Sequence, residues 1–118
     1  MLSALASEHV ANPRNRGPLS DFTHYGVAGS PGGGPYVEIW LITKDNCITS
    51  ATYETHGCPS SVAASSVLCT LATGRDMEKM KNFDSRDLLL VLGGLPEGKE
   101  EFAEMAICAF SAAMKGGN

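Results

Sequence analysis

The chain has 118 residues, 43% of them hydrophobic, which suffices for one sizeable core, so we expect a single domain over residues 1–118. Its net charge of -4 and its nine scattered lysine and arginine residues provide no basic stripe, which argues against nucleic acid as a partner. Apolar runs such as LLLVLGGL are far shorter than the roughly 20 residues of a membrane span, and the opening MLSALASEHV lacks the basic start of a signal peptide. We therefore expect a cytoplasmic protein with no membrane partner and with reduced cysteines.

The first quarter of the chain predicts one helix and one weak strand. Residues 2–12 are predicted to be helical, because apolar side chains recur at helical spacing and a proline ends the pattern. THYGVAG, residues 23–29, predicts a strand that a glycine interrupts. His9 is expected on the helix face, and His24 on the strand surface. The apolar stripe of this helix comprises Leu2, Leu5, Ala6 and Val10.

A β-hairpin over residues 36–55 is the clearest predicted element. Val37, Ile39 and Leu41 alternate with other side chains along the first strand. Lys44-Asp45-Asn46 then forms the turn, and Ile48 to Thr55 forms the returning strand.

The second half of the chain predicts helices. A helix over 60–74 follows Pro59, whose missing N–H group is no loss in a first turn. Asp76 and Asp84 are expected to cap two short helices, the second of which ends at Gly93-Gly94. Because strands come early and helices late, the predicted class is α+β, a small antiparallel sheet with helices packed on one face. The last helix, from about Lys99 to Met114, has the apolar stripe Phe102, Met105, Ala106, Ala109 and Ala113.

A loop without bulky side chains, SPGGGP, precedes the hairpin. Antiparallel pairing about a turn at Asp45 brings Gly32–Gly34 opposite Gly57 and Cys58, so the loop and Cys58 are expected to be neighbours. The three glycines suit a tight turn with positive φ better than a phosphate cradle, because neither a helix nor a suitable lysine follows them.

Cys58 is the best candidate for a reactive atom. It precedes the long helix, whose unpaired N–H groups and positive dipole end favour a thiolate. A thiol kept only for packing is the alternative. His56 lies two residues earlier and is expected on the same face, as a surface histidine in preference to a ligand or acid–base group.

The other cysteines lie too far along the chain to join Cys58. Cys47 is at the opposite end of the same strand, on the order of 30 Å away at ~3.3 Å per residue. Cys69 is about 16 Å away along the helix, and Cys108 is expected to be a small core residue. A zinc finger is therefore excluded, and no Ser-His-Asp arrangement, dinucleotide fingerprint or carboxylate pair points to an enzyme.

Four segments of the sequence have a distinctive order and spacing: EHVANPRNRGPL, GVAGSPGGG, YETHGCPSSVAASSVLCTLATGR and LPEGK. Together they cover nearly the whole chain and resemble the U-type iron–sulfur cluster assembly scaffold family, the IscU, SufU and NifU N-terminal proteins. The resemblance implies a three-stranded antiparallel sheet covered by helices. It also implies assembly of an iron–sulfur cluster from iron and sulfur, with a cysteine desulfurase and a chaperone as partners.

The resemblance also assigns ligand positions, several of which hold other residues here. The family's loop reads Cys-Gly-Asp, and its cysteine and aspartate correspond to Gly33 and Pro35. A His-Cys pair of IscU-type members, or a cysteine of SufU-type members, corresponds to Glu101 and Phe102. Two of the implied metal ligands are therefore missing from the loop.

Cys58 is the matched member of the family's ligand set, with His56 and Glu101 as further candidates for an iron–sulfur cluster or zinc. A closed site needs about four protein ligands. Leu95, Pro96 and Lys99 correspond to the family's chaperone-recognition motif.

Two functions remain open at this point. The first is a non-enzymatic scaffold-like assembly protein with a degenerate ligand set, in which Cys58 accepts sulfur and any metal is held weakly or by two subunits. The second is an interaction module that binds or regulates a cysteine desulfurase or another assembly partner.

Overall fold

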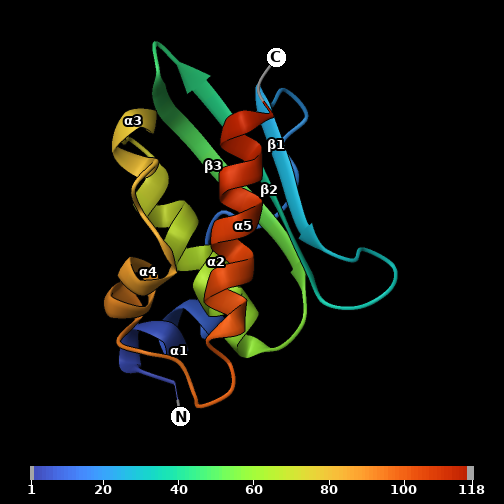
Figure 1. Cartoon of the computed structure of the whole chain (residues 1–118), viewed down its shortest axis with the longest axis vertical. Coiled ribbons are helices and arrows are strands. Elements are labelled where there is room, and N and C mark those ends of the chain that lie inside the picture. The colour runs from blue at the N-terminus through green and yellow to red at the C-terminus, as the bar shows by residue number, and fades with distance from the viewer. Residues whose placement is uncertain (1, 117–118) are drawn as a thin grey trace.

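The computed structural model describes residues 2–116 and shows the predicted α+β fold, a three-stranded antiparallel sheet with helices packed on it (Figure 1). The sheet has the order β1-β2-β3, and β1 and β3 are its two edges. The elements in chain order are α1 (Ala4–Ala11), β1 (His24–Gly29), β2 (Tyr36–Lys44), β3 (Cys47–His56), α2 (Pro59–Ala72), α3 (Met77–Met80), α4 (Ser85–Leu92) and α5 (Glu101–Lys115).

The predicted hairpin is confirmed as the β2–β3 pair. Its two-residue turn consists of Asp45 and Asn46, whose φ values of 52° and 66° are both left-handed, as a type I′ turn requires. The pairing register runs from Lys44 opposite Cys47 to Tyr36 opposite His56. The chain segments that flank Tyr36 and His56 therefore leave the sheet at the same end.

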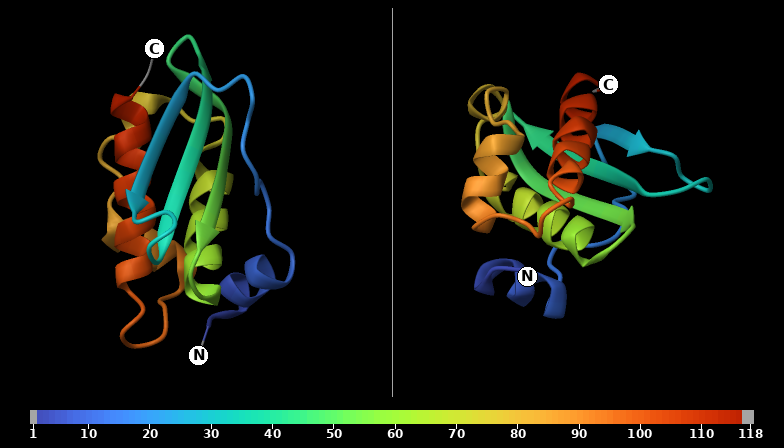
Figure 2. Two further views of the ribbon diagram at one scale, coloured as in Figure 1. Left: turned by 90° about the vertical axis from the view of Figure 1, so that its right-hand side faces the viewer. Right: turned by 60° about the horizontal axis from the view of Figure 1, so that its bottom comes forward.

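Helices α2 and α5 both pack against the sheet and against each other (Figure 1, Figure 2). β1 and α5 approach closely at Gly26, where a side chain would collide with the backbone of Ala113. Burial of apolar area between the sheet and the helices is the main stabilising contribution to the fold. The largest fully buried apolar side chains are Tyr53, Phe110, Ile39, Leu41, Ile48, Leu68, Leu88, Leu92 and Val37.

Capping residues set the ends of the short helices, as predicted. Asp76 accepts a hydrogen bond from the Glu78 backbone N–H at 2.8 Å and begins α3, which ends at Met80. Asp84 and Asp87 form a reciprocal capping box at the start of α4, and Gly93 ends that helix with a left-handed φ of 76°. No helix within residues 2–116 has the length and apolar character to cross a membrane.

α1 packs on α2 through most of the predicted stripe, since Ala6 is buried and Leu2 and Val10 pack partly against the core. Leu5, expected inside, is exposed, whereas His9 is buried. His9 Nδ1 lies 2.7 Å from Ser66 Oγ of α2, and the same hydroxyl accepts a hydrogen bond from the Arg14 backbone N–H at 3.1 Å. Ser66 therefore fixes both α1 and the segment that follows it. A polar residue occupies the inner face of α1 because its hydrogen-bond partner is buried with it.

Protonation of His9 should destabilise the fold. Burial, reinforced by the nearby Arg14 charge and opposed by Glu8, lowers the pKa of His9 below its ordinary value of 6.5. Between these two pKa values, the unfolded chain binds a proton at His9 that the folded chain does not bind. The free energy of unfolding present above pH 6.5 should therefore decline as the pH falls through the lowered pKa of the folded chain.

Urea unfolding at about pH 7.5 and about pH 5.5 measures this loss, because few carboxylates titrate in that window. The His9→Gln variant, which lacks the titrating ring, should lose less stability between the two pH values than the natural chain does. Equal losses in both proteins would show that His9 is not responsible.

Candidate functional site

Cys58 is the N-cap residue of α2, as the sequence predicts. Its backbone is extended, with φ −111° and ψ 176°, and its carbonyl accepts a hydrogen bond from the Ser61 N–H at 2.9 Å. The thiol makes no capping hydrogen bond and is partly exposed. The sulfur thus lies at the positive end of a 14-residue helix, where negative charge is stabilised.

A buried hydrogen-bond network holds this junction between β3 and α2 in place. The Thr55 hydroxyl donates to the Tyr36 carbonyl at 2.7 Å and makes a short contact with the Ser61 hydroxyl. Thr55 and Ser61 are both buried, so these bonds tie β2, β3 and the first turn of α2 together. The network fixes the backbone on both sides of Cys58.

The glycine loop, residues 30–35, projects from the same end of the sheet (Figure 1). A hollow of about 330 Å³ separates part of the loop from β3, and His56 lines it. The exposed His56 ring stacks on Tyr36, with ring centroids 6.3 Å apart and planes inclined by 20°. The structure thus brings the loop beside His56 and to the end of the hairpin that leads into Cys58. The other lining residues are Pro31, Gly32, Gly34 and Tyr36.

Gly32 is the only one of the three central loop glycines with a positive φ, 82°. A β-carbon on Gly33 would lie 3.7 Å from the Ser30 side chain, an ordinary van der Waals distance, and one on Gly34 would meet open space. The expected reason for three glycines, a turn with positive φ, therefore holds for Gly32 alone. The backbone at Gly33 can accept a side chain.

α5 contributes an aromatic ring to the site. Phe102 is 7% exposed, and its Cε1 lies 3.4 Å from where a β-carbon on Gly57 would stand. The Lys99 ammonium lies over the same ring, 5.8 Å from its centroid. Glu101, the other ligand candidate on α5, is exposed. The sequence placed Phe102 on the apolar stripe of the last helix and at a position that the resemblance assigns to a ligand, but it gave no signal of the contact with Gly57.

The segment before α5 forms a turn. The Lys99 N–H donates to the Pro96 carbonyl at 2.9 Å, and Gly98 has a left-handed φ of 84°. Leu95 and Pro96 are half-buried, whereas Lys99 is exposed. The turn places Lys99 above the Phe102 ring.

The other cysteines are distributed only partly as predicted. Cys69 is fully buried in α2, and burial strongly raises the pKa of its thiol. Cys47 is half-buried at the far end of β3. The prediction that Cys108 belongs to the core is wrong, since Cys108 is exposed. It lies two positions after the buried Ala106, about 200° around the helix, so apolar neighbours in sequence did not place it inside.

The residues at this end of the sheet do not fit a metal ion or an iron–sulfur cluster. No group of three or more histidine, cysteine, aspartate or glutamate side chains within residues 2–116 is placed to hold a metal. Cys58, His56 and Glu101 therefore do not form the tetrahedral set of about four ligands that zinc and iron–sulfur sites use.

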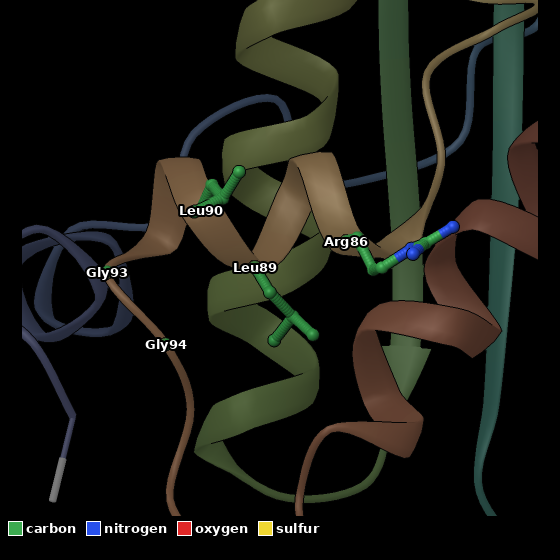
Figure 3. A pocket seen from close by; sticks show the side chains of 5 residues that line it. All are labelled: Arg86, Leu89, Leu90, Gly93 and Gly94. Atoms are coloured by element: carbon green, nitrogen blue, oxygen red, sulfur yellow. The ribbon is translucent and has the colours of Figure 1, made fainter.

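Two of the other hollows are larger than the one beside the glycine loop and lie away from Cys58. One, of about 470 Å³, is apolar and lies along α4, where Leu89 and Leu90 line it (Figure 3). Arg86, Gly93 and Gly94 complete the lining, which includes no nucleophilic side chain. The other is polar and lies at Cys47, at the opposite end of β3. Neither hollow includes Cys58 among its lining residues.

Comparisons with known proteins agree with the fold. The family model of the NifU-like N-terminal domain matches residues 3–116. The iron–sulfur cluster assembly scaffold protein IscU 1 of Archaeoglobus fulgidus is 32% identical over 97% of this chain and 74% of its own length. The scaffold protein IscU of Aquifex aeolicus is 30% identical over 92% of this chain and 70% of its own length.

A solved structure of similar fold is the N-terminal NifU-like protein of Brucella abortus. It superposes with a TM-score of 0.60, covers 96% of this chain and 77% of its own, and is 24% identical. The chain therefore belongs to the family of NifU-like N-terminal domains, to which the U-type iron–sulfur cluster assembly scaffolds belong.

Proposed function

We propose that this chain acts in iron–sulfur cluster assembly as a scaffold-family protein and that Cys58 receives sulfur from a cysteine desulfurase. The observation that best supports this proposal is the position of Cys58, whose partly exposed thiol lies at the N-terminus of α2 and makes no capping hydrogen bond. Relatives that match almost the whole chain are named as assembly scaffolds, which supports the assembly context.

The proposed step is thiol–persulfide exchange. The Cys58 thiolate attacks the terminal sulfur of the desulfurase persulfide, and a new S–S bond forms at Cys58 as the donor's S–S bond breaks. The desulfurase cysteine leaves as a thiolate, and the transferred sulfur remains on Cys58 as a persulfide. The chain is a stoichiometric acceptor in this step and has no turnover of its own.

The surroundings of Cys58 suit an acceptor that docks on a larger partner. The rigid β3–α2 junction fixes the thiol, while the hollow beside the glycine loop leaves His56 exposed on the same end of the sheet. A chaperone contact, also part of the proposal, involves Leu95, Pro96 and Lys99 of the turn before α5.

Incubation with a cysteine desulfurase and cysteine tests the proposal. We expect sulfur on Cys58, detected by mass spectrometry of the alkylated peptides, and no sulfur transfer to a Cys58→Ser variant. Cys108→Ser is the matched control, because it removes a more exposed thiol and should leave the transfer unchanged. Sulfur on Cys108 or Cys47 instead of Cys58, or none on any cysteine, would contradict the proposal.

A further inference from the structure

Phe102 occupies the side of the Cys58 site from which α5 would offer a ligand. Its ring packs against Gly57, which is next to Cys58 in the chain. Only 7% of the surface of Phe102 is exposed to solvent. An aromatic carbon surface in this place offers no lone pair to a metal ion, and the buried ring leaves no gap beside Gly57.

A positive charge lies over the same ring. The Lys99 ammonium is 5.8 Å from the Phe102 centroid, a distance at which the ring face attracts the cation. Lys99 has no carboxylate partner among the ion pairs of residues 2–116. The exposed ammonium is itself no metal ligand, because it has no lone pair to donate.

The glycine loop has room for a metal ligand but provides none. Pro35 has no side-chain donor, and Gly33 has no side chain, yet a β-carbon at Gly33 would make only an ordinary contact. Backbone geometry therefore does not force the absence of a thiol there. What remains at this end of the sheet is the Cys58 thiol and the exposed His56 ring.

We infer that this site carries sulfur without metal: the Phe102 ring fills the place from which α5 would offer a ligand, and the cargo is sulfane sulfur alone. This inference rests on the proposed function and restricts the cargo of the site to sulfur. It assigns Phe102 a role beyond the apolar stripe of α5, that of an aromatic ring standing where a metal ligand would otherwise be.

Metal titration tests the inference. The natural chain, saturated with zinc and then dialysed, should retain less than about 0.1 equivalent by elemental analysis, because it lacks a tetrahedral ligand set. The triple variant Gly33→Cys/Pro35→Asp/Phe102→Cys should retain about one zinc per chain, since it adds three donors to Cys58. Cobalt binding by the variant should give the intense absorption of a cobalt–thiolate site, which reports the ligand type directly.

The matched control is Gly33→Cys/Pro35→Asp/Glu104→Cys. It adds the same three groups but leaves Phe102 in place, because Glu104 is exposed and lies about 200° around α5 from Phe102. The control should retain much less zinc than the triple variant. Circular dichroism establishes that both variants are folded before the metal is measured.

Two results would overturn the inference. One is near-stoichiometric zinc or iron in the natural chain that disappears in Cys58→Ser. The other is a folded triple variant that holds no more metal than the Glu104→Cys control. The proposed function is tested separately, by sulfur transfer from the desulfurase to the natural chain. If the natural chain binds metal but still accepts sulfur, the inference is refuted and the proposed function stands.

Discussion

Gly26→Ala should lower the free energy of unfolding by at least about 3 kcal/mol, at the upper end of what overpacking costs. A β-carbon on Gly26 would lie 2.2 Å from the Ala113 nitrogen and 2.4 Å from the Ala109 carbonyl oxygen. Both are backbone atoms of α5, so no side-chain rotation can relieve the collision. The helix must move away from β1, which removes apolar contacts along its length.

Thermal and urea unfolding, followed by circular dichroism, measure the effect. A loss of about 3 kcal/mol should lower the melting temperature by more than about 10 °C in a domain of this size. Gly34→Ala is the matched control, because its β-carbon meets open space and its φ is not positive. That variant should differ from the natural chain by less than about 1 kcal/mol. A Gly26→Ala variant as stable as Gly34→Ala would show that α5 does not approach β1 as described.

Local sequence signals were sufficient to predict most of the fold. The hairpin followed from alternation around Asp45-Asn46, and the starts of α3 and α4 followed from Asp76 and Asp84, since turns and caps depend on residues close in sequence. The inner face of α1 was harder to predict. His9 is buried because Ser66, 57 residues later, provides its hydrogen-bond partner, and no local pattern contains that information.

The candidate site shows the same division between local and distant information. The position of Cys58 at a helix N-terminus could be predicted from Pro59 and the residues that follow, whereas the contact between Phe102 and Gly57 depends on how α5 packs over the β3–α2 junction. Cys108 was assigned to the core because α5 is apolar around much of its circumference. Cys108 is in fact exposed, because its position on α5 depends on which side of the helix faces the sheet.

Cys58 should be the fastest of the four thiols to react with iodoacetamide at neutral pH. Its sulfur is partly exposed at the N-terminus of α2, where the helix dipole stabilises the attacking thiolate. We expect it to react at least a few-fold faster than Cys108, which is exposed but lies within α5, far from a helix N-terminus. Cys69, fully buried and with a raised pKa, should react on the order of 100-fold more slowly, because it is accessible only when the fold opens.

Peptide mapping after short labelling times gives the four rates, and the same measurement in concentrated urea separates the effect of the fold from that of neighbouring residues. Unfolding removes α2, so the advantage of Cys58 over Cys108 and Cys47 should disappear, while Cys69 should become as reactive as the others. If Cys58 keeps its advantage in urea, its reactivity comes from the adjacent sequence and not from the helix. If it reacts no faster than Cys108 in the folded chain, the helix does not activate the thiol, and the sulfur-acceptor role of Cys58 loses its physical basis.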